Sequence, residues 1–190
     1  MQRKLDPELK EWFDANLLNP TPIPFIEPRN PVQMLLLTAF ACKGITEIGA
    51  DNYGPMVERF QKTIGEAQGE PWCLSFIQSC VAYVETFGFK SQLFPTEHCL
   101  TAYTNSLCRR PLVPIPGDMV IYHLPETSKG HAELVTAVKN NGDAYETIAG
   151  NTSALTGVIE RNGDGVYTKL RTPTGLGKMK VLGYLRLFET

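Results

Sequence analysis

The strongest chemical signal in this chain is a cysteine at the start of a predicted helix. The segment EPWCLSFIQSC places Cys73 directly after Pro71 and Trp72, and apolar residues then recur at three- and four-residue spacing. Unpaired backbone N–H groups and the positive end of the helix dipole favour a thiolate there, so Cys73 is a candidate nucleophile. The alternative is a buried structural cysteine, the more common role of free cysteines, and it suits Cys80 two helical turns further on.

A thiolate nucleophile needs a partner that takes and returns a proton, and histidine does this near neutral pH. His131 is the best placed of three histidines because it opens the predicted strand GHAELVTAV. Taken alone, a histidine at a strand start is more often an ordinary surface residue. The next predicted strand ends at Asn151, whose side-chain oxygen would meet the second ring nitrogen of His131. A turn asparagine beside Gly150 is an equally good interpretation of Asn151.

Four other residues are weaker candidates for a substrate groove. Asn52 and Tyr53, in GADNYGP, would line it, although a simple turn is the favoured role. Trp72 is either a groove wall or core packing. Glu133 shares a strand face with His131, since side chains at i and i+2 project to the same side; its alternative is a solvated carboxylate at a strand edge. No calcium-loop motif is present, and we expect neither a metal nor a cofactor.

The elements that must position these residues change from helices to strands along the chain. Asp6-Pro7 and Asn30-Pro31 are helix-start signals, and prolines between them predict an extended arm over 19–30. The predicted helices are 6–18, 31–42, a short run ending at 64, 72–87 and 96–107. The predicted strands are 119–124, 131–138, 144–149, 164–171 and 179–188. Helices first and strands last favour an α+β domain over a doubly wound fold.

Composition narrows the class of protein. With 190 residues and 43% hydrophobic side chains, the chain has the size and composition of one ordinary globular domain. A net charge of -2 predicts no nucleic-acid or anionic-lipid partner. Five cysteines without a C-x-x-C pair argue against a disulfide framework or a zinc ribbon. The N-terminal segment lacks the features of a secretory signal peptide, and no apolar run is long enough to cross a bilayer.

Six segments, in order, resemble those of CHAP (cysteine, histidine-dependent amidohydrolase/peptidase) domains, which belong to the papain-like/NlpC-type cysteine hydrolases. They are EIGADNYGPMVERFQ, EPWCLSF, PIPGDMVIY, GHAELVTAV, ETIAGNTS and GDGVYTKLR. The resemblance covers about residues 44–187. It implies N-terminal helices packed on a central antiparallel sheet of about five strands. We therefore expect an N-terminal helix, arm and helix over 1–43 and a hydrolase domain over 44–190.

The resemblance also implies a function: cleavage of a peptide or amide bond of bacterial cell-wall peptidoglycan. The enzyme would be a cysteine endopeptidase or an N-acetylmuramoyl-L-alanine amidase, with Cys73 as nucleophile, His131 as base and Asn151 as the orienting residue. Relatives often carry a carboxylate two positions before this asparagine, where the chain has Ala149. Glu133 is the residue expected to compensate for it.

The predicted function implies a location and a set of partners. The protein would be made in the cytoplasm and act at the cell wall or in the periplasm, as a phage lysin or a secreted antibacterial effector. Its substrate would be the peptidoglycan stem peptide, and a delivery carrier or an immunity protein would be a further partner. Two alternatives stay open: a cytosolic amidase or peptidase of small peptides, and a noncatalytic wall-binding domain on the same fold.

Overall fold

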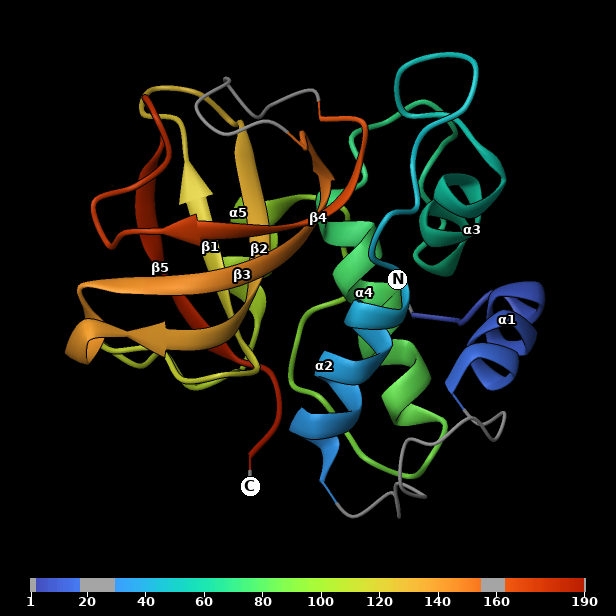
Figure 1. The fold of residues 1–190 in the computed structure, drawn as a ribbon, viewed down its shortest axis with the longest axis horizontal. Coiled ribbons are helices and arrows are strands. Elements are labelled where there is room, and N and C mark those ends of the chain that lie inside the picture. The colour runs from blue at the N-terminus through green and yellow to red at the C-terminus, as the bar shows by residue number, and fades with distance from the viewer. Residues whose placement is uncertain (1–2, 18–29, 155–162, 190) are drawn as a thin grey trace.

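Five helices and a five-stranded antiparallel sheet make up the computed structural model over its described residues, 3–17, 30–154 and 163–189 (Figure 1). The helices are α1 (Pro7–Leu17), α2 (Pro31–Ala41), α3 (Pro55–Thr63), α4 (Cys73–Glu85) and α5 (Cys99–Asn105). The strands are β1 (Asp118–His123), β2 (Gly130–Lys139), β3 (Ala144–Thr152), β4 (Gly165–Arg171) and β5 (Lys180–Arg186), with a short 3-10 helix, η1 (Asn140–Gly142), between β2 and β3. The predicted α+β class, with helices packed on a sheet, is confirmed.

The sheet has the strand order β4-β3-β2-β1-β5, so β2 lies at its centre. Figure 1 shows α4 between the sheet and the helices α1 and α3, with α2 crossing in front of α4. Alternate residues of the strands enter two separate cores, because successive side chains point to opposite faces. Ala132 and Leu134 pack in the core beneath the helices, whereas Val135 packs with Tyr122 and Tyr145 on the other face.

Helix starts follow the capping signals of the sequence. The Asp6 carboxylate accepts a hydrogen bond from the Leu9 backbone N–H, and Asn30 accepts two from the first turn of α2. Helix α5 is shorter than the predicted 96–107, because the side chain of His98 caps it by accepting from the Thr101 N–H. The chain at Ser106 is already extended, which ends α5 at Asn105.

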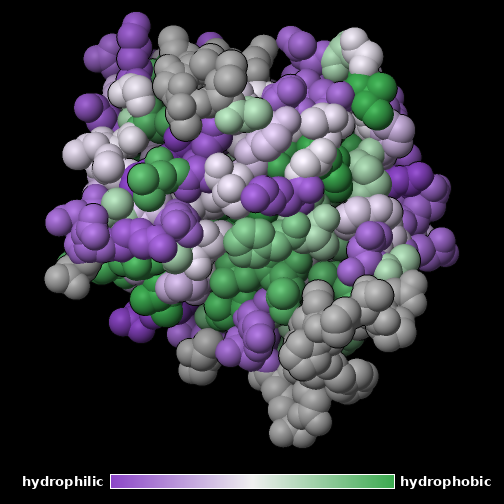
Figure 2. Space-filling view, viewed as in Figure 1, coloured by the Kyte–Doolittle hydropathy of each residue, from purple (hydrophilic) through white to green (hydrophobic). Residues whose placement is uncertain are grey.

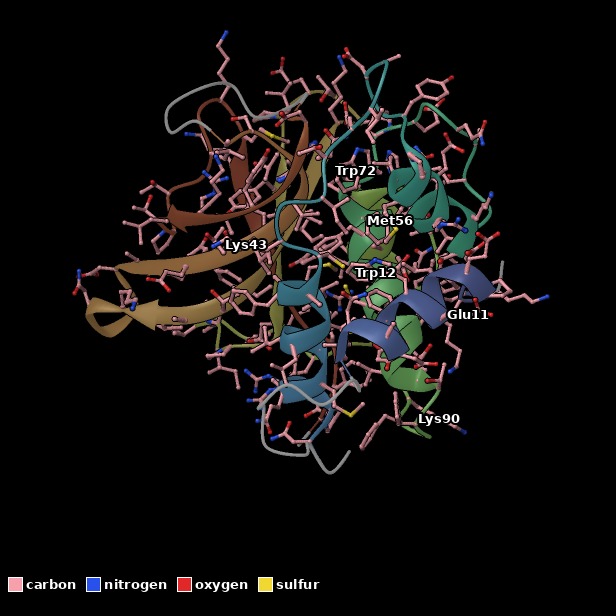
Figure 3. All side chains as sticks on the ribbon, turned by 45° about the vertical axis from the view of Figure 1, so that its right-hand side comes forward. Glu11, Trp12, Lys43, Met56, Trp72 and Lys90 are labelled. Carbon is pink, nitrogen blue, oxygen red and sulfur yellow. The ribbon has the colours of Figure 1, made fainter. Side chains whose placement is uncertain are left out.

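The two N-terminal helices share the main core with the rest of the chain. Leu9 and Phe13 of α1 are fully buried in it, and Trp12 packs against it from the side of α1 that faces α4 (Figure 3). The guanidinium of Arg3 pairs with Glu85 at the end of α4, with Nε 3.0 Å from Oε2. The predicted proline-rich arm falls almost entirely on 18–29, outside the described residues.

An apolar patch lies on the surface around α2. Figure 2 shows it near the centre of the view. Phe40, in the last turn of α2, is among the exposed large hydrophobic residues. Within the described ranges, no helix combines the length and the apolar character needed to span a membrane.

Candidate active site

The centre of the candidate site is the point where β2 and β3 separate. Strand β2 pairs with β1 from Gly130 to Leu134, but its pairing with β3 begins only at Leu134. The first residues of β2 therefore have one edge open, and the start of α4 lies against it. The Ala132 backbone hydrogen-bonds the Cys73 sulfur, so a group of the open strand edge contacts the nucleophile candidate.

Two glycines permit this close approach. A Cβ atom added at Gly150 of β3 would lie 2.6 Å from the Trp72 ring and 2.8 Å from the Phe76 Cβ. One added at Gly130 of β2 would lie 2.7 Å from the Cys99 Cβ. Real Cβ atoms do not come this close to other atoms, so glycine at these positions lets α4 and the start of α5 press against the open strand edge.

Cys73 is the first residue of α4 and is 5% exposed. No side chain caps this helix, because Trp72 occupies the N-cap position without a capping hydrogen bond. The first-turn N–H groups therefore remain available to a negative charge. The pKa of Cys73 lies well below that of an ordinary thiol: a hydrogen bond from the Cys99 thiol contributes most, burial opposes it, and His131 lowers it further.

His131 lies beside Cys73 and is buried. Its Nε2 is 3.3 Å from Glu133 Oε1. Burial by itself would lower the pKa of His131, but the negative charges of Cys73 and Glu133 outweigh burial and raise it to about 10. The two shifts together favour a thiolate–imidazolium ion pair at neutral pH.

Glu133 is fully buried, so its interpretation as a solvated carboxylate at a strand edge is wrong. The guanidinium of Arg171, in β4, donates hydrogen bonds to both carboxylate oxygens of Glu133 at distances of 2.6 to 3.1 Å. The Thr147 hydroxyl donates to Oε2 at 2.7 Å. Burial would raise the pKa of Glu133, but the ion-pair contact with His131 and the hydrogen bonds from Arg171 outweigh burial and lower the pKa to about 2. A carboxylate held ionised in this way stabilises the protonated form of His131.

Asn151 does not make the predicted bond to His131. Its Nδ2 donates to Asn52 Oδ1 at 2.8 Å, and Asn52 Nδ2 donates in turn to the Gly69 carbonyl at 3.1 Å, which fixes both amide orientations. Asn151 Oδ1 and His131 Nε2 are both buried without a hydrogen-bond partner among the described residues. The structure thus brings Asn151 to the site but puts Glu133, on the histidine's own strand, at the second ring nitrogen.

The three other groove candidates lie outside the pocket that contains the nucleophile. Trp72 is fully buried, stacks on Phe60 and donates from its indole Nε1 to Glu47 Oε1 at 2.8 Å, so it packs in the core above α4 (Figure 3). The amide of Asn52 bonds Asn151 and the Gly69 carbonyl, and the ring of Tyr53 packs over Gly69. None of the three lines this pocket, and a place for them in a wider groove stays a prediction.

The pocket itself encloses about 230 Å³ beside the sulfur of Cys73. Cys73, Cys99, His131 and Asn151 line it, together with the glutamates Glu66, Glu70 and Glu97 and the residues 128–130. Burial raises the pKa of Glu66 to about 8, although the Ser75 hydroxyl, which donates to it, opposes the shift. Glu66 therefore holds its proton over most of the neutral range, which limits the negative charge facing the thiolate.

Cys99 is the site residue that the sequence analysis missed. Its Sγ lies 3.9 Å from Cys73 Sγ, and it too is buried. The pKa of Cys99 is raised well above its usual value, first by the hydrogen bond to Cys73 and then by burial. When Cys73 is the thiolate, only Cys99 has a proton to donate in this contact. Its only sequence signal was its place at the start of a predicted helix, which says nothing about a neighbour 26 residues away.

Comparison of the chain with protein-family models, with curated proteins and with solved structures returns no match. Among the residues that the structure describes, no group of three or more histidine, cysteine, aspartate or glutamate side chains could hold a metal ion.

Proposed function

We propose that this protein is a cysteine hydrolase that cleaves a peptide or amide bond of bacterial peptidoglycan. The observation that carries the catalytic part is the position of Cys73, at an uncapped helix start, against His131, whose other ring nitrogen faces the buried Glu133. A cysteine with only a packing role needs neither a lowered pKa nor a neighbouring histidine that in turn contacts a carboxylate. The substrate class rests on the resemblance of the sequence segments to CHAP domains.

The reaction follows from these roles. The Cys73 thiolate attacks the carbonyl carbon, and the N–H groups of the first turn of α4 stabilise the oxyanion that forms. Protonated His131 gives its proton to the leaving amine, which departs and leaves a thioester on Cys73. His131 then removes a proton from water, the hydroxide attacks the thioester, and the thiolate is released.

Glu133 acts through His131 and is a positioning residue. Its carboxylate stabilises the imidazolium and holds the ring beside the sulfur, while Arg171 and Thr147 keep the carboxylate itself in place. The ion pair with Arg171 also prevents Glu133 from taking the proton of His131, because it favours the ionised carboxylate. Glu133 thus supplies the charge that the resemblance to CHAP domains leads one to expect two positions before Asn151, where this chain has Ala149.

The enzyme would be an endopeptidase or an N-acetylmuramoyl-L-alanine amidase, serving as a phage lysin or as a secreted antibacterial effector. Purified peptidoglycan is the direct substrate to test, with released fragments identified by mass spectrometry. New amino groups with intact glycan strands are expected from either activity, and the fragment that carries the new amine distinguishes them. A parallel assay with soluble muropeptides separates wall digestion from hydrolysis of small peptides only.

The matched control lies on the same helix. Cys73→Ala should abolish fragment release, whereas Cys80→Ala, the same change two turns along α4 in the core, should retain it. Removal of a nucleophile costs at least about a thousandfold in turnover. Undiminished digestion by Cys73→Ala would refute the proposal, as would the absence of any fragment from the parent protein on either substrate.

A further inference from the structure

We propose that Cys73 and Cys99 form an oxidation site, at which a hydroperoxide converts the two thiols into a reversible disulfide. The two sulfur atoms lie 3.9 Å apart, and both residues line the pocket. A disulfide bond is about 2.05 Å long, so the sulfurs need to close by about 2 Å. They come from the first residues of two different helices.

The two thiols differ in the way that such a reaction requires. Cys73 is held as the thiolate, the form that reacts with peroxides, and Cys99 remains a thiol that donates to it. The pocket of about 230 Å³ beside Cys73 admits a small hydroperoxide. The remaining cysteines, Cys42, Cys80 and Cys108, do not line this pocket.

The chemistry balances with the peroxide as the only oxidant. With hydrogen peroxide, the Cys73 thiolate attacks one peroxide oxygen, the O–O bond breaks, and Cys73 sulfenic acid forms as hydroxide leaves and takes the proton of the His131 imidazolium to become water. The Cys99 sulfur then attacks the sulfur of Cys73, the S–O bond breaks, and the second water leaves with the proton of Cys99. Two thiols are oxidised to one disulfide, and one peroxide is reduced to two waters.

A second thiol at this position has a specific consequence. A sulfenic acid without a resolving thiol proceeds to sulfinic and sulfonic acids, which ordinary thiols do not reduce. Capture by Cys99 stops the oxidation at the disulfide, which a dithiol reverses. The disulfide occupies the sulfur of Cys73, so the oxidised protein has no nucleophile. The pair would protect the site from permanent damage while switching it off.

The test measures the oxidation state of the cysteines directly and requires no peptidoglycan. Its result is therefore independent of whether the proposed function is correct. The reduced protein is treated with hydrogen peroxide, remaining thiols are blocked with N-ethylmaleimide, and the product is digested with trypsin and analysed by mass spectrometry. Cys73 and Cys99 fall in different tryptic peptides, 63–90 and 91–109. We expect loss of two of the five thiols and one cross-link between these peptides, which dithiothreitol removes.

Because each of the two peptides contains a second cysteine, variants assign the cross-link. Cys99→Ser keeps a hydrogen-bond donor beside Cys73 but removes the resolving thiol, so Cys73 should instead gain two or three oxygen atoms that dithiothreitol does not remove. Cys108→Ser, the matched control on the same peptide, should cross-link as the parent does. A cross-link that survives in Cys99→Ser would overturn the proposal. So would a parent protein whose Cys73 becomes over-oxidised as fast as that of Cys99→Ser.

Discussion

Two pairs of neighbouring thiols in this molecule have opposite properties. Cys42 and Cys80 lie in the main core, where burial raises the pKa of Cys42 well above its usual value and the Cys80 thiol adds to the shift. Cys73 and Cys99 are nearly as buried, yet the pKa of Cys73 is lowered. Burial is therefore not what distinguishes the pairs. The difference lies in the charges and donors around the sulfur: His131 and an uncapped helix start at one pair, apolar side chains at the other.

The comparison shows why proximity of two cysteines alone is no signal of function. A thiol beside a thiol in an apolar core has no partner that stabilises its charged form, and burial raises the pKa of Cys42. At the pocket, one thiol donates to the other while an imidazolium supplies the opposite charge. The same pair of side chains is inert in one place and reactive in the other.

The largest expected difference is in alkylation. At neutral pH, iodoacetamide should modify Cys73 more than about a hundredfold faster than Cys42 or Cys80, because the two core thiols are fully buried and become accessible only when the protein unfolds. Peptide mass spectrometry over a time course measures each rate. Equal rates at Cys73 and Cys80, which lie on the same tryptic peptide, would remove the distinction between the two pairs.

Neutralising Glu133 should affect both stability and pH dependence. Glu133→Gln removes a buried carboxylate that Arg171 and His131 both contact, and loss of one partner of a buried ion pair costs about 3–5 kcal/mol of unfolding free energy. It should also lower the pKa of His131 from about 10, so that activity is lost at a lower pH on the alkaline side. The part of the stability that comes from the raised His131 pKa is present below its unfolded value and is lost as the pH rises through about 10.

Urea unfolding and a pH–rate profile measure these effects, and Glu146→Gln is the matched control. Glu146 pairs with Lys139 at 3.2 Å, but both side chains are 47% exposed, so its loss should cost less than about 1 kcal/mol and leave the profile unchanged. Should Glu133→Gln fail to fold, the double variant with Arg171→Gln also removes the guanidinium that faces position 133 and keeps the pH test. An unmoved alkaline limb in a folded variant would mean that Glu133 has only a structural role.

Replacing Cys99 should shift the other limb of the profile. Cys99→Ala removes the donor that contributes most to the low pKa of Cys73, so the acid limb should move up by about one to two pH units, as expected for a hydrogen bond to a charged group. Cys99→Ser, which restores a donor, should bring the limb back. Cys108→Ala should leave it in place; an equal shift in that variant would point to a general loss of packing.

The smallest effect is expected at Asn151. Because its amide bonds Asn52 and not His131, Asn151→Ala should reduce turnover by less than about tenfold, in line with the 0.5–1.5 kcal/mol of one hydrogen bond. Asn151 has φ 51°, where alanine is strained, so Asn151→Gly serves as the control that removes the side chain without the strain. A loss near a thousandfold in both variants would return Asn151 to the role of orienting residue.

The sequence by itself determined the local features of the site. Proline and asparagine caps, apolar spacing and strand alternation predicted the helices and strands, because each depends on residues within one or two turns of each other. The position of Cys73 at the start of α4 and of His131 near the start of β2 followed in the same way. Their opposition across the open edge of β2 was an expectation of the family resemblance, since no local pattern encodes it.

Only the tertiary structure decided which groups surround these two side chains. Glu133 looked like an exposed carboxylate, because charged residues are rarely buried unless paired, and its partner Arg171 lies 38 residues away. Cys99 had no local base or nucleophile motif, yet packing against Gly130 brings it to Cys73. Burial and pairing depend on residues from several elements at once, and they set the charge state of a thiol or an imidazole. The sequence could therefore identify a candidate nucleophile and base, but their ionisation was fixed by the fold.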